Sequence, residues 1–203
     1  MDGLFVCFEG IDGSGKTVQA QMLKEAAVGK GRRCILLSYP DYGSEYGRLI
    51  ERYLKGEEKK DVRELFLIFL ADMVKNDALV RREVGGGSVV ISNRYMYSTT
   101  AYQCAAGFDY DSARAIQKSI GLEVPDIVFY LDIPAKVAYS RKIAQKGSAD
   151  KFEKDSAYLN KVRSMYNRLM GDGHMGEECI SIDGSAAKEQ IHEAVIGKVG
   201  RLL

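Results

Sequence analysis

The stretch that decides the fold is Leu4-Phe5-Val6-Cys7-Phe8-Glu9-Gly10-Ile11-Asp12-Gly13-Ser14-Gly15-Lys16-Thr17. Its opening apolar run predicts a buried strand, and residues 10–17 match the spacing G-x-x-x-x-G-K-[ST] of a phosphate-binding loop. The glycines let successive backbone N–H groups turn toward phosphate oxygens, and the N-terminus of the following helix adds its partial positive charge. A strand, loop and helix in this order favour a nucleoside triphosphate site over a turn without a ligand.

The polar residues of this loop have distinct expected tasks. Lys16 is predicted to bridge the β- and γ-phosphates, and the hydroxyl of Thr17 to ligate Mg²⁺. The triphosphate should therefore contact every position of the loop: Gly10, Ile11, Asp12, Gly13, Ser14, Gly15, Lys16 and Thr17.

Length and composition predict one domain spanning residues 1–203. A chain of 203 residues that is 46% hydrophobic can bury about 70% of its unfolded surface in a single core. The 29 basic and 28 acidic residues nearly cancel, so no overall field favours nucleic acid or an anionic membrane, and neither is an expected partner. Phosphate binding must then come from locally placed cations.

The four cysteines, Cys7, Cys34, Cys104 and Cys179, are far apart in the sequence and do not form a C-x-x-C pair. A metal site built from them is not expected, and free thiols are typical of a reducing compartment. The sequence shows neither a signal-peptide pattern at its start nor a run of about 18 apolar residues. These features predict a cytoplasmic protein.

Apolar runs alternate with amphipathic segments along the whole chain, which is typical of βαβ units. Most of the apolar runs are continuous, so helices should cover both faces of the sheet. The expected fold is a three-layer α/β P-loop NTPase fold with a five-stranded parallel sheet flanked by helices. The expected strands are 4–9, 33–38, 88–92, 126–131 and 178–182, and the expected helices are 15–29, 44–55, 61–82, 94–106, 110–121, 134–146, 154–170 and 186–202.

A second group of functional residues follows the third expected strand. Asn93-Arg94-Tyr95 lies at its carboxyl end, and the next helix carries Ser98 to Gln103. The carboxyl ends of parallel strands form the ligand crevice of such a sheet, so Arg94 should reach the same cleft as Lys16. Its guanidinium fork suits a second phosphate that must be bound and oriented for in-line attack. The alternative is a surface arginine, but cations are disfavoured at a helix start without an anion to meet.

With these residues in view, the chain resembles the thymidylate kinase family over nearly its whole length. The matching stretches are 8–17, 39–41, 65–72, 91–95 with 101–103, 125–126 with 130–132, and 141–153. The resemblance implies that Arg94 holds the acceptor phosphate, that Phe69 stacks on the pyrimidine ring and that Tyr102 lies against the deoxyribose. It also implies that Asp12 lies near the phosphates and Mg²⁺. The substrate-binding set that follows is Asp12, Tyr39, Pro40, Phe69, Met73, Arg94, Thr99, Tyr102 and Gln103.

The basic segment at about 141–153 resembles the lid of that family, which closes over the donor triphosphate. Gly13 stands where some family members carry an arginine in the phosphate loop, so the catalytic cations should come from the lid. The candidates are Arg141, Lys146 and Lys151, with Lys16, Arg94, Arg141 and Asp12 as the catalytic set. A solvated basic helix end would show the same composition.

Three positions depart from the usual family pattern. Asn93 replaces a common aspartate that could hold a Mg²⁺-bound water, which leaves metal positioning to Thr17 and Asp12. Tyr42 replaces an arginine that often follows Phe-Pro-Asp, and Met73 replaces an arginine that would donate to the thymine carbonyl. Methionine packs on a ring but hydrogen-bonds weakly, so the base is the least determined part of the substrate.

The resemblance implies a homodimeric, Mg²⁺-dependent enzyme that catalyses ATP + dTMP → ADP + dTDP. Another pyrimidine nucleotide could be the acceptor. A deoxynucleoside acceptor would require a carboxylate base at the 5′-hydroxyl, for which Glu9 or Asp41 would have to serve. A nucleotide-binding regulatory protein with weak catalysis is a third reading, since a fold does not fix a chemistry.

Overall fold

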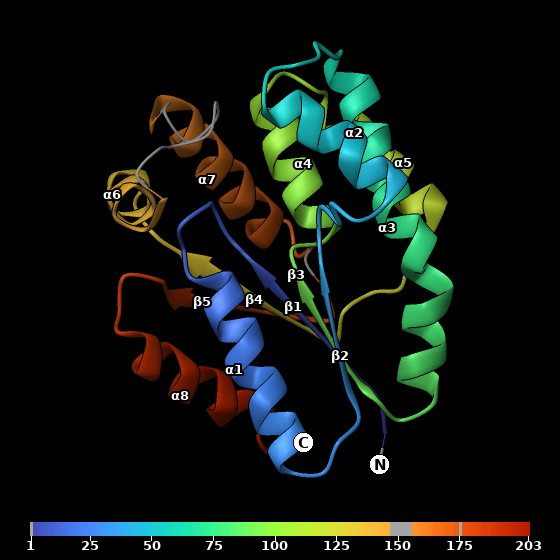
Figure 1. Ribbon diagram of the computed structural model, residues 1–203, viewed down its shortest axis with the longest axis vertical. Helices are drawn as coiled ribbons and strands as arrows, with labels where there is room; N and C mark the ends of the chain where they lie inside the picture. Colours follow the sequence, from blue (N-terminus) through green and yellow to red (C-terminus); the bar gives the residue numbers. More distant parts are fainter. Residues whose placement is uncertain (1, 147–155, 175) are drawn as a thin grey trace.

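The computed structural model describes residues 2–146, 156–174 and 176–203. Five parallel strands form one sheet in the order β2-β3-β1-β4-β5, with helices on both faces (Figure 1). The strands are β1 (Leu4–Glu9), β2 (Cys34–Ser38), β3 (Val89–Asn93), β4 (Ile127–Asp132) and β5 (Glu178–Asp183). The helices are α1 (Lys16–Gly29), α2 (Glu45–Leu54), α3 (Val62–Gly85), α4 (Met96–Ala105), α5 (Tyr110–Ile120), α6 (Ala135–Lys146), α7 (Ser156–Gly171) and α8 (Lys188–Val199).

Alternate residues of the central strand β1 face two separate cores. Leu4, Val6 and Phe8 pack in the layer that contains α1 and α8. Phe5 and Cys7 pack in the larger layer on the other face, which contains α3, α4, α5 and α7 (Figure 1). All six residues of β1 are buried, because a strand covered on both faces has no polar side. The predicted three-layer α/β fold is confirmed.

The expected strands agree with the structure to within one residue at each end. Helix starts follow from local capping: the side chains of Ser44, Asp61 and Asp109 accept hydrogen bonds from the first-turn N–H groups of α2, α3 and α5. Helix α4 differs, because Tyr95 at its N-cap gives no such bond. The chain turns into β3 at Gly86 and Gly87, and α3 extends through Gly85, three residues beyond the expected end at 82.

In the described part of the chain, no helix is long and apolar enough to cross a membrane. No cluster of three or more potential metal-binding His, Cys, Asp or Glu side chains occurs there either. The four cysteines are free thiols. Burial raises the pKa of Cys34 and Cys104 to about 11 and that of Cys179 to about 12, so these thiols stay protonated at neutral pH.

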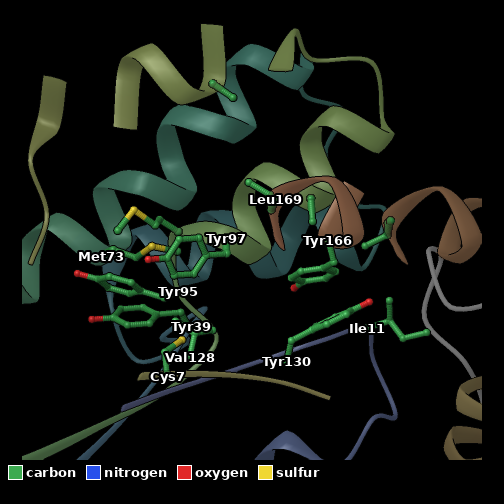
Figure 2. Close-up of a cluster of buried hydrophobic side chains, with 14 of the residues drawn as sticks. Cys7, Ile11, Tyr39, Met73, Tyr95, Tyr97, Val128, Tyr130, Tyr166 and Leu169 are labelled. Atoms are coloured by element: carbon green, nitrogen blue, oxygen red, sulfur yellow. The ribbon is translucent and has the colours of Figure 1, made fainter. Parts of the chain in front are cut away.

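Helix α7 is fastened to β4 by a bidentate ion pair. Arg163 donates from Nε and Nη2 to the two carboxylate oxygens of Asp132, at 2.6 and 2.7 Å. The ring of Tyr166, one turn further along α7, stacks on Tyr130 of β4 at 5.1 Å between centroids (Figure 2). The hydrogen bonds from Arg163 hold the pKa of Asp132 below its ordinary value, despite partial burial.

We expect Asp132→Asn to lower the free energy of unfolding by about 1 kcal/mol at pH 7, a value reduced for partial exposure of the pair. Because the folded-state pKa of Asp132 is depressed, its contribution is present above the unfolded pKa of about 4 and is lost as the pH falls through the folded pKa. Urea denaturation at pH 7 and below pH 4 should therefore show the difference shrinking on acidification. Glu178→Gln, in an exposed pair with Lys198, is the control, and a difference independent of pH would contradict the prediction.

Candidate functional site

A cavity of about 560 Å³ lies between the loop after β1 and the residues that follow β3 and β5. Its volume is in the range of small-molecule sites. It lies at the carboxyl edge of the sheet, where parallel α/β folds bind ligands. Its lining comprises Asp12, Gly13, Ser14, Gly15, Lys16, Thr17, Val18, Gln19, Asn93, Arg94, Arg141, Ala186, Lys188 and Ile191. The structure thus brings the predicted donor loop and Arg94 into one cavity.

The ammonium group of Lys16 is bonded to other residues of the phosphate loop. Lys16 is only 6% exposed, and its Nζ donates to the Ile11 carbonyl at 2.9 Å and approaches Ser14 Oγ at 3.4 Å. Gly13 has φ +83°, and a Cβ there would lie 2.5 Å from the carbonyl oxygen of Ala138 in α6. A side chain at position 13 would therefore push the loop away from α6, which agrees with the absence of an arginine there.

Arg94 crosses from the end of β3 to the phosphate loop. Its Nη1 donates to the Gly10 carbonyl at 3.1 Å and to Ser98 Oγ at 3.0 Å, and its Nη2 forms an ion pair with Asp12. The guanidinium also lies 5.1 Å from the ring centroid of Tyr102. Burial is the largest single influence and lowers the pKa of Arg94, but the surrounding anionic groups, Asp12 foremost, together raise it well above its ordinary value. Arg94 is thus a fixed cation at the loop.

Glu9 is the residue whose role the sequence did not reveal. Its side chain is 0% exposed, and it accepts hydrogen bonds from the N–H groups of Tyr95 and Ser98 and from the hydroxyls of Ser98 and Tyr166. Burial raises the pKa of Glu9, while the bond from Ser98 and the charge of Arg94 lower it. Because both carboxylate oxygens are engaged away from solvent, Glu9 is not available as the base that a deoxynucleoside acceptor would require.

Asp41, the other carboxylate considered for that role, is also engaged. Its Oδ1 accepts from Gly43 N at 3.1 Å, and its Oδ2 pairs with Lys75 at 3.1 Å. Its backbone N–H donates to the fully buried carboxylate of Asp72 at 2.8 Å. Asp72 thereby fastens the loop after β2 to α3.

The loop that carries Tyr39 and Pro40 has a cis peptide bond between these two residues. Tyr39 is buried, and its hydroxyl accepts a hydrogen bond from Asn76 Nδ2 at 3.2 Å. Its ring lies 6.1 Å from that of Tyr95. The predicted residues Tyr39 and Pro40 are therefore held by α3 and by the residue after Arg94.

The predicted base-binding residues occupy different environments. Phe69 is partly exposed on α3. Met73, one turn further, is 2% exposed and packs with Tyr39, Tyr95 and Tyr97 in the core (Figure 2). The side chain of Met73 fills an aromatic cluster, and its expected contact with the base stays a prediction.

On α4, Tyr102 accepts a hydrogen bond from Asp12 N at 3.1 Å, so it lies beside both Arg94 and the phosphate loop. Thr99 is 2% exposed, and its Oγ1 has no hydrogen-bond partner among the described residues. Gln103 is also buried on this helix. Thr99 therefore offers an unsatisfied hydroxyl on the helix that carries Tyr102.

The lid candidates are described only in part. Arg141 lines the cavity, and its guanidinium donates to the carbonyls of Gly184 at 2.6 Å and Ser185 at 3.1 Å. Lys146 ends α6, but its side chain is outside the described residues, as is Lys151 altogether. The contribution of residues 186–191 to the cavity was not predicted, although Asp183-Gly184-Ser185 at the carboxyl end of β5 is a signal that could have found it.

Comparison with known proteins agrees with this geometry. The sequence model described as thymidylate kinase matches residues 8–195. The chain belongs to the thymidylate kinase family. It is 34% identical to the thymidylate kinase of Leptospira borgpetersenii, over 93% of this chain and 89% of that protein, and 34% identical to a probable thymidylate kinase of Pyrococcus horikoshii, over 98% and 97%. Its fold is similar to that of the thymidylate kinase from Candida albicans, with a TM-score of 0.78 at 20% identity, covering 98% of this chain and 92% of that one.

The contact between Gly13 and α6 gives a test of the thymidylate kinase phosphate loop. We expect Gly13→Ala to weaken ATP binding by at least about tenfold in isothermal titration calorimetry, because the new Cβ displaces the loop from α6. Gly31→Ala is the matched control, since Gly31 also has positive φ (+76°) but open space around its Cβ position. Equal ATP affinities of the two variants would contradict the proposed constraint.

Proposed function

We propose that this protein transfers the γ-phosphoryl group of ATP to dTMP, giving ADP and dTDP. The observation that carries the proposal is the convergence of Lys16 and Arg94 on one cavity. One cation belongs to a loop built for a triphosphate, and the other is a partly buried guanidinium suited to a second phosphate. Family membership supports the identity of both substrates.

The acceptor phosphate is already an anionic nucleophile, so the reaction needs no strong general base. One of its oxygens bonds to the γ-phosphorus as the bond to the β,γ-bridging oxygen breaks, and ADP leaves. Lys16 neutralises charge on the β- and γ-phosphates, and Arg94 aligns the acceptor for in-line attack. In this role the acceptor phosphate takes the place of the Asp12 carboxylate on Arg94 Nη2.

The residues present fit a magnesium ion bound together with ATP. Mg²⁺ prefers a few protein oxygens alongside phosphate oxygens and water. Thr17 Oγ1 accepts a hydrogen bond from Asn93 Nδ2 at 3.1 Å and keeps a second lone pair, and the Asp12 carboxylate lines the same cavity. Asn93 Oδ1 is buried without a hydrogen-bond partner among the described residues, so it can accept from a metal-bound water. When bound, Mg²⁺ supplies charge neutralisation at the phosphates.

Further cations are assigned to the segment at 141–153. Arg141 borders the cavity, and its bonds to two backbone carbonyls hold it at the 184–185 loop. We assign Lys146 and Lys151 to the donor phosphates on the basis of family resemblance. The chain as a whole, residues 1–203, acts as one domain in this proposal.

Base selection is assigned to α3 and α4. Phe69 stacks on the pyrimidine, and Tyr102 excludes a 2′-hydroxyl. The buried hydroxyl of Thr99 has no hydrogen-bond partner among the described residues, so Thr99 supplies the hydrogen bond to the base edge. Gln103 lies nearby on the same helix. A hydroxyl both donates and accepts, so it discriminates weakly between thymine and cytosine.

The protein is also assigned as a cytoplasmic homodimer. Leu67 and Val74, two turns apart on α3, are 54% and 45% exposed, which supports a helix face that packs against a second copy. Light scattering should give the mass of two chains, about twice 22.5 kDa. The Leu67→Glu substitution should lower the measured mass toward that of a single chain. The free cysteines agree with a reducing compartment.

Replacing Arg94 tests the proposed acceptor site. We expect Arg94→Ala to raise KM for dTMP and lower kcat together, with kcat/KM reduced at least about 100-fold, because charge-assisted bonds to the acceptor are lost. KM for ATP should change by less than about twofold. Arg33→Ala is the control, since Arg33 is 74% exposed before the amino end of β2. Normal dTMP kinetics in Arg94→Ala would refute the acceptor assignment.

Thr99 and Met73 provide a paired test of base recognition. Thr99→Val keeps the shape but removes the hydroxyl, and we expect kcat/KM for dTMP to fall by about two- to tenfold, the effect of one hydrogen bond. Met73→Leu conserves volume in the aromatic core and should leave kcat/KM for dTMP within about twofold of the wild-type value. The opposite pattern, with a loss only in Met73→Leu, would place the base against α3 at Met73.

A further inference from the structure

Glu9 connects the phosphate loop to the start of α4. It ends β1, and Gly10 follows it as the first residue of the loop. Its Oε1 accepts from the N–H groups of Tyr95 at 2.8 Å and Ser98 at 3.2 Å. Helix α4 has no side-chain cap from its own N-cap residue, and the carboxylate at the end of β1 accepts from the N–H groups of the N-cap Tyr95 and of Ser98 in the first turn. Glu9 thereby fixes Tyr95, the residue after Arg94, and Ser98, whose hydroxyl accepts from Arg94.

The other carboxylate oxygen reaches Arg94 through a hydroxyl. Glu9 Oε2 accepts from Ser98 Oγ and from Tyr166 Oη at 2.8 Å, and Ser98 Oγ accepts from Arg94 Nη1 at 3.0 Å. The Cys7 thiol also approaches Glu9 Oε1, at 3.9 Å. All five groups that meet the Glu9 carboxylate can act as donors, which is the arrangement that an ionised carboxylate requires. The chain of bonds therefore runs from a buried anion, through Ser98, to the guanidinium of Arg94.

We propose that Glu9 is a positioning residue for the transfer reaction: it holds Arg94 over the phosphate loop while the acceptor phosphate replaces Asp12. The inference rests on the proposed function, in which Arg94 binds that phosphate. Arg94 has two carboxylates nearby, and they differ in exposure. The side chain of Asp12 is 27% exposed, so an entering anion can displace it, whereas Glu9 is fully buried and keeps its bonds.

The backbone of Arg94 makes this support necessary. Its φ of +71° lies in the left-handed region, which a residue with a Cβ adopts only at an energetic cost. Glu9 holds the N–H groups of Tyr95, the next residue, and of Ser98, four residues on, and Arg94 N donates to Phe8 O at 3.0 Å. The residues on both sides of the strained backbone are thus tied to β1.

The test compares Glu9→Gln and Ser98→Ala with Thr100→Val in the full-length protein. Glutamine keeps the size of Glu9, but its amide nitrogen cannot accept from Ser98 and Tyr166. Thr100 is buried on the same helix, and its hydroxyl bonds to the Met96 carbonyl within α4. We expect KM for dTMP to rise about 10- to 100-fold in Glu9→Gln and Ser98→Ala, with KM for ATP within about twofold and Thr100→Val unchanged. Ser98→Thr should restore the wild-type value.

A second readout does not depend on activity. In the wild-type protein the guanidinium NMR signals of Arg94 should be resolved and slow to exchange with water, and in Glu9→Gln and Ser98→Ala they should broaden. If Glu9→Gln and Ser98→Ala keep wild-type dTMP kinetics and wild-type Arg94 signals, Glu9 does not position Arg94. The same conclusion follows if KM for dTMP and KM for ATP rise together in these variants. If the wild-type protein does not phosphorylate dTMP, the proposed function fails, and the Arg94 signals alone decide the role of Glu9. If Glu9→Gln does not fold, Ser98→Ala and Tyr166→Phe carry the test.

Discussion

The site depends on the parallel pairing of β1 with β3. In this register Phe8 lies opposite Asn93, and the pairing ends in a hydrogen bond from Arg94 N to Phe8 O at 3.0 Å. Each strand then delivers its next residues to the same edge of the sheet: the phosphate loop from β1 and Arg94 from β3. Two segments about 80 residues apart in the sequence thus come to line one cavity.

The cations Arg94 and Lys16 are held in place by protein groups before any substrate binds. Arg94 is paired with Asp12, and the carboxylate of Glu9 lies behind it through Ser98. Lys16 is held by the carbonyl of Ile11. Preorganised cations of this kind stabilise the charge that develops during phosphoryl transfer without reorganising at that moment. In the proposed reaction the acceptor phosphate replaces the Asp12 carboxylate at Arg94, so the guanidinium is paired with an anion both before and after the acceptor binds.

The sequence predicted the fold and the donor loop because both leave local signals. Apolar runs marked the five strands, and the spacing of Gly10, Lys16 and Thr17 marked the loop. Arg94 was found from its place after a strand. Glu9 and Tyr166 were not assigned their roles, since their contacts join residues 157 positions apart and carry no spacing pattern. The burial of Met73 could not be predicted from the sequence either. A helix face that packs on a core and a helix face that contacts a ligand have the same periodicity of apolar residues.

The central claim is phosphoryl transfer to an existing phosphate, and direct product analysis tests it. In ³¹P NMR spectra of the protein with ATP, Mg²⁺ and dTMP, the signals of ADP and dTDP should grow in equal amounts while dTMP declines. Replacing dTMP with thymidine should give no nucleotide product, because Glu9 is buried with both carboxylate oxygens hydrogen-bonded and Asp41 is paired with Lys75. Formation of dTMP from thymidine, or ADP with inorganic phosphate and no dTDP, would contradict the account.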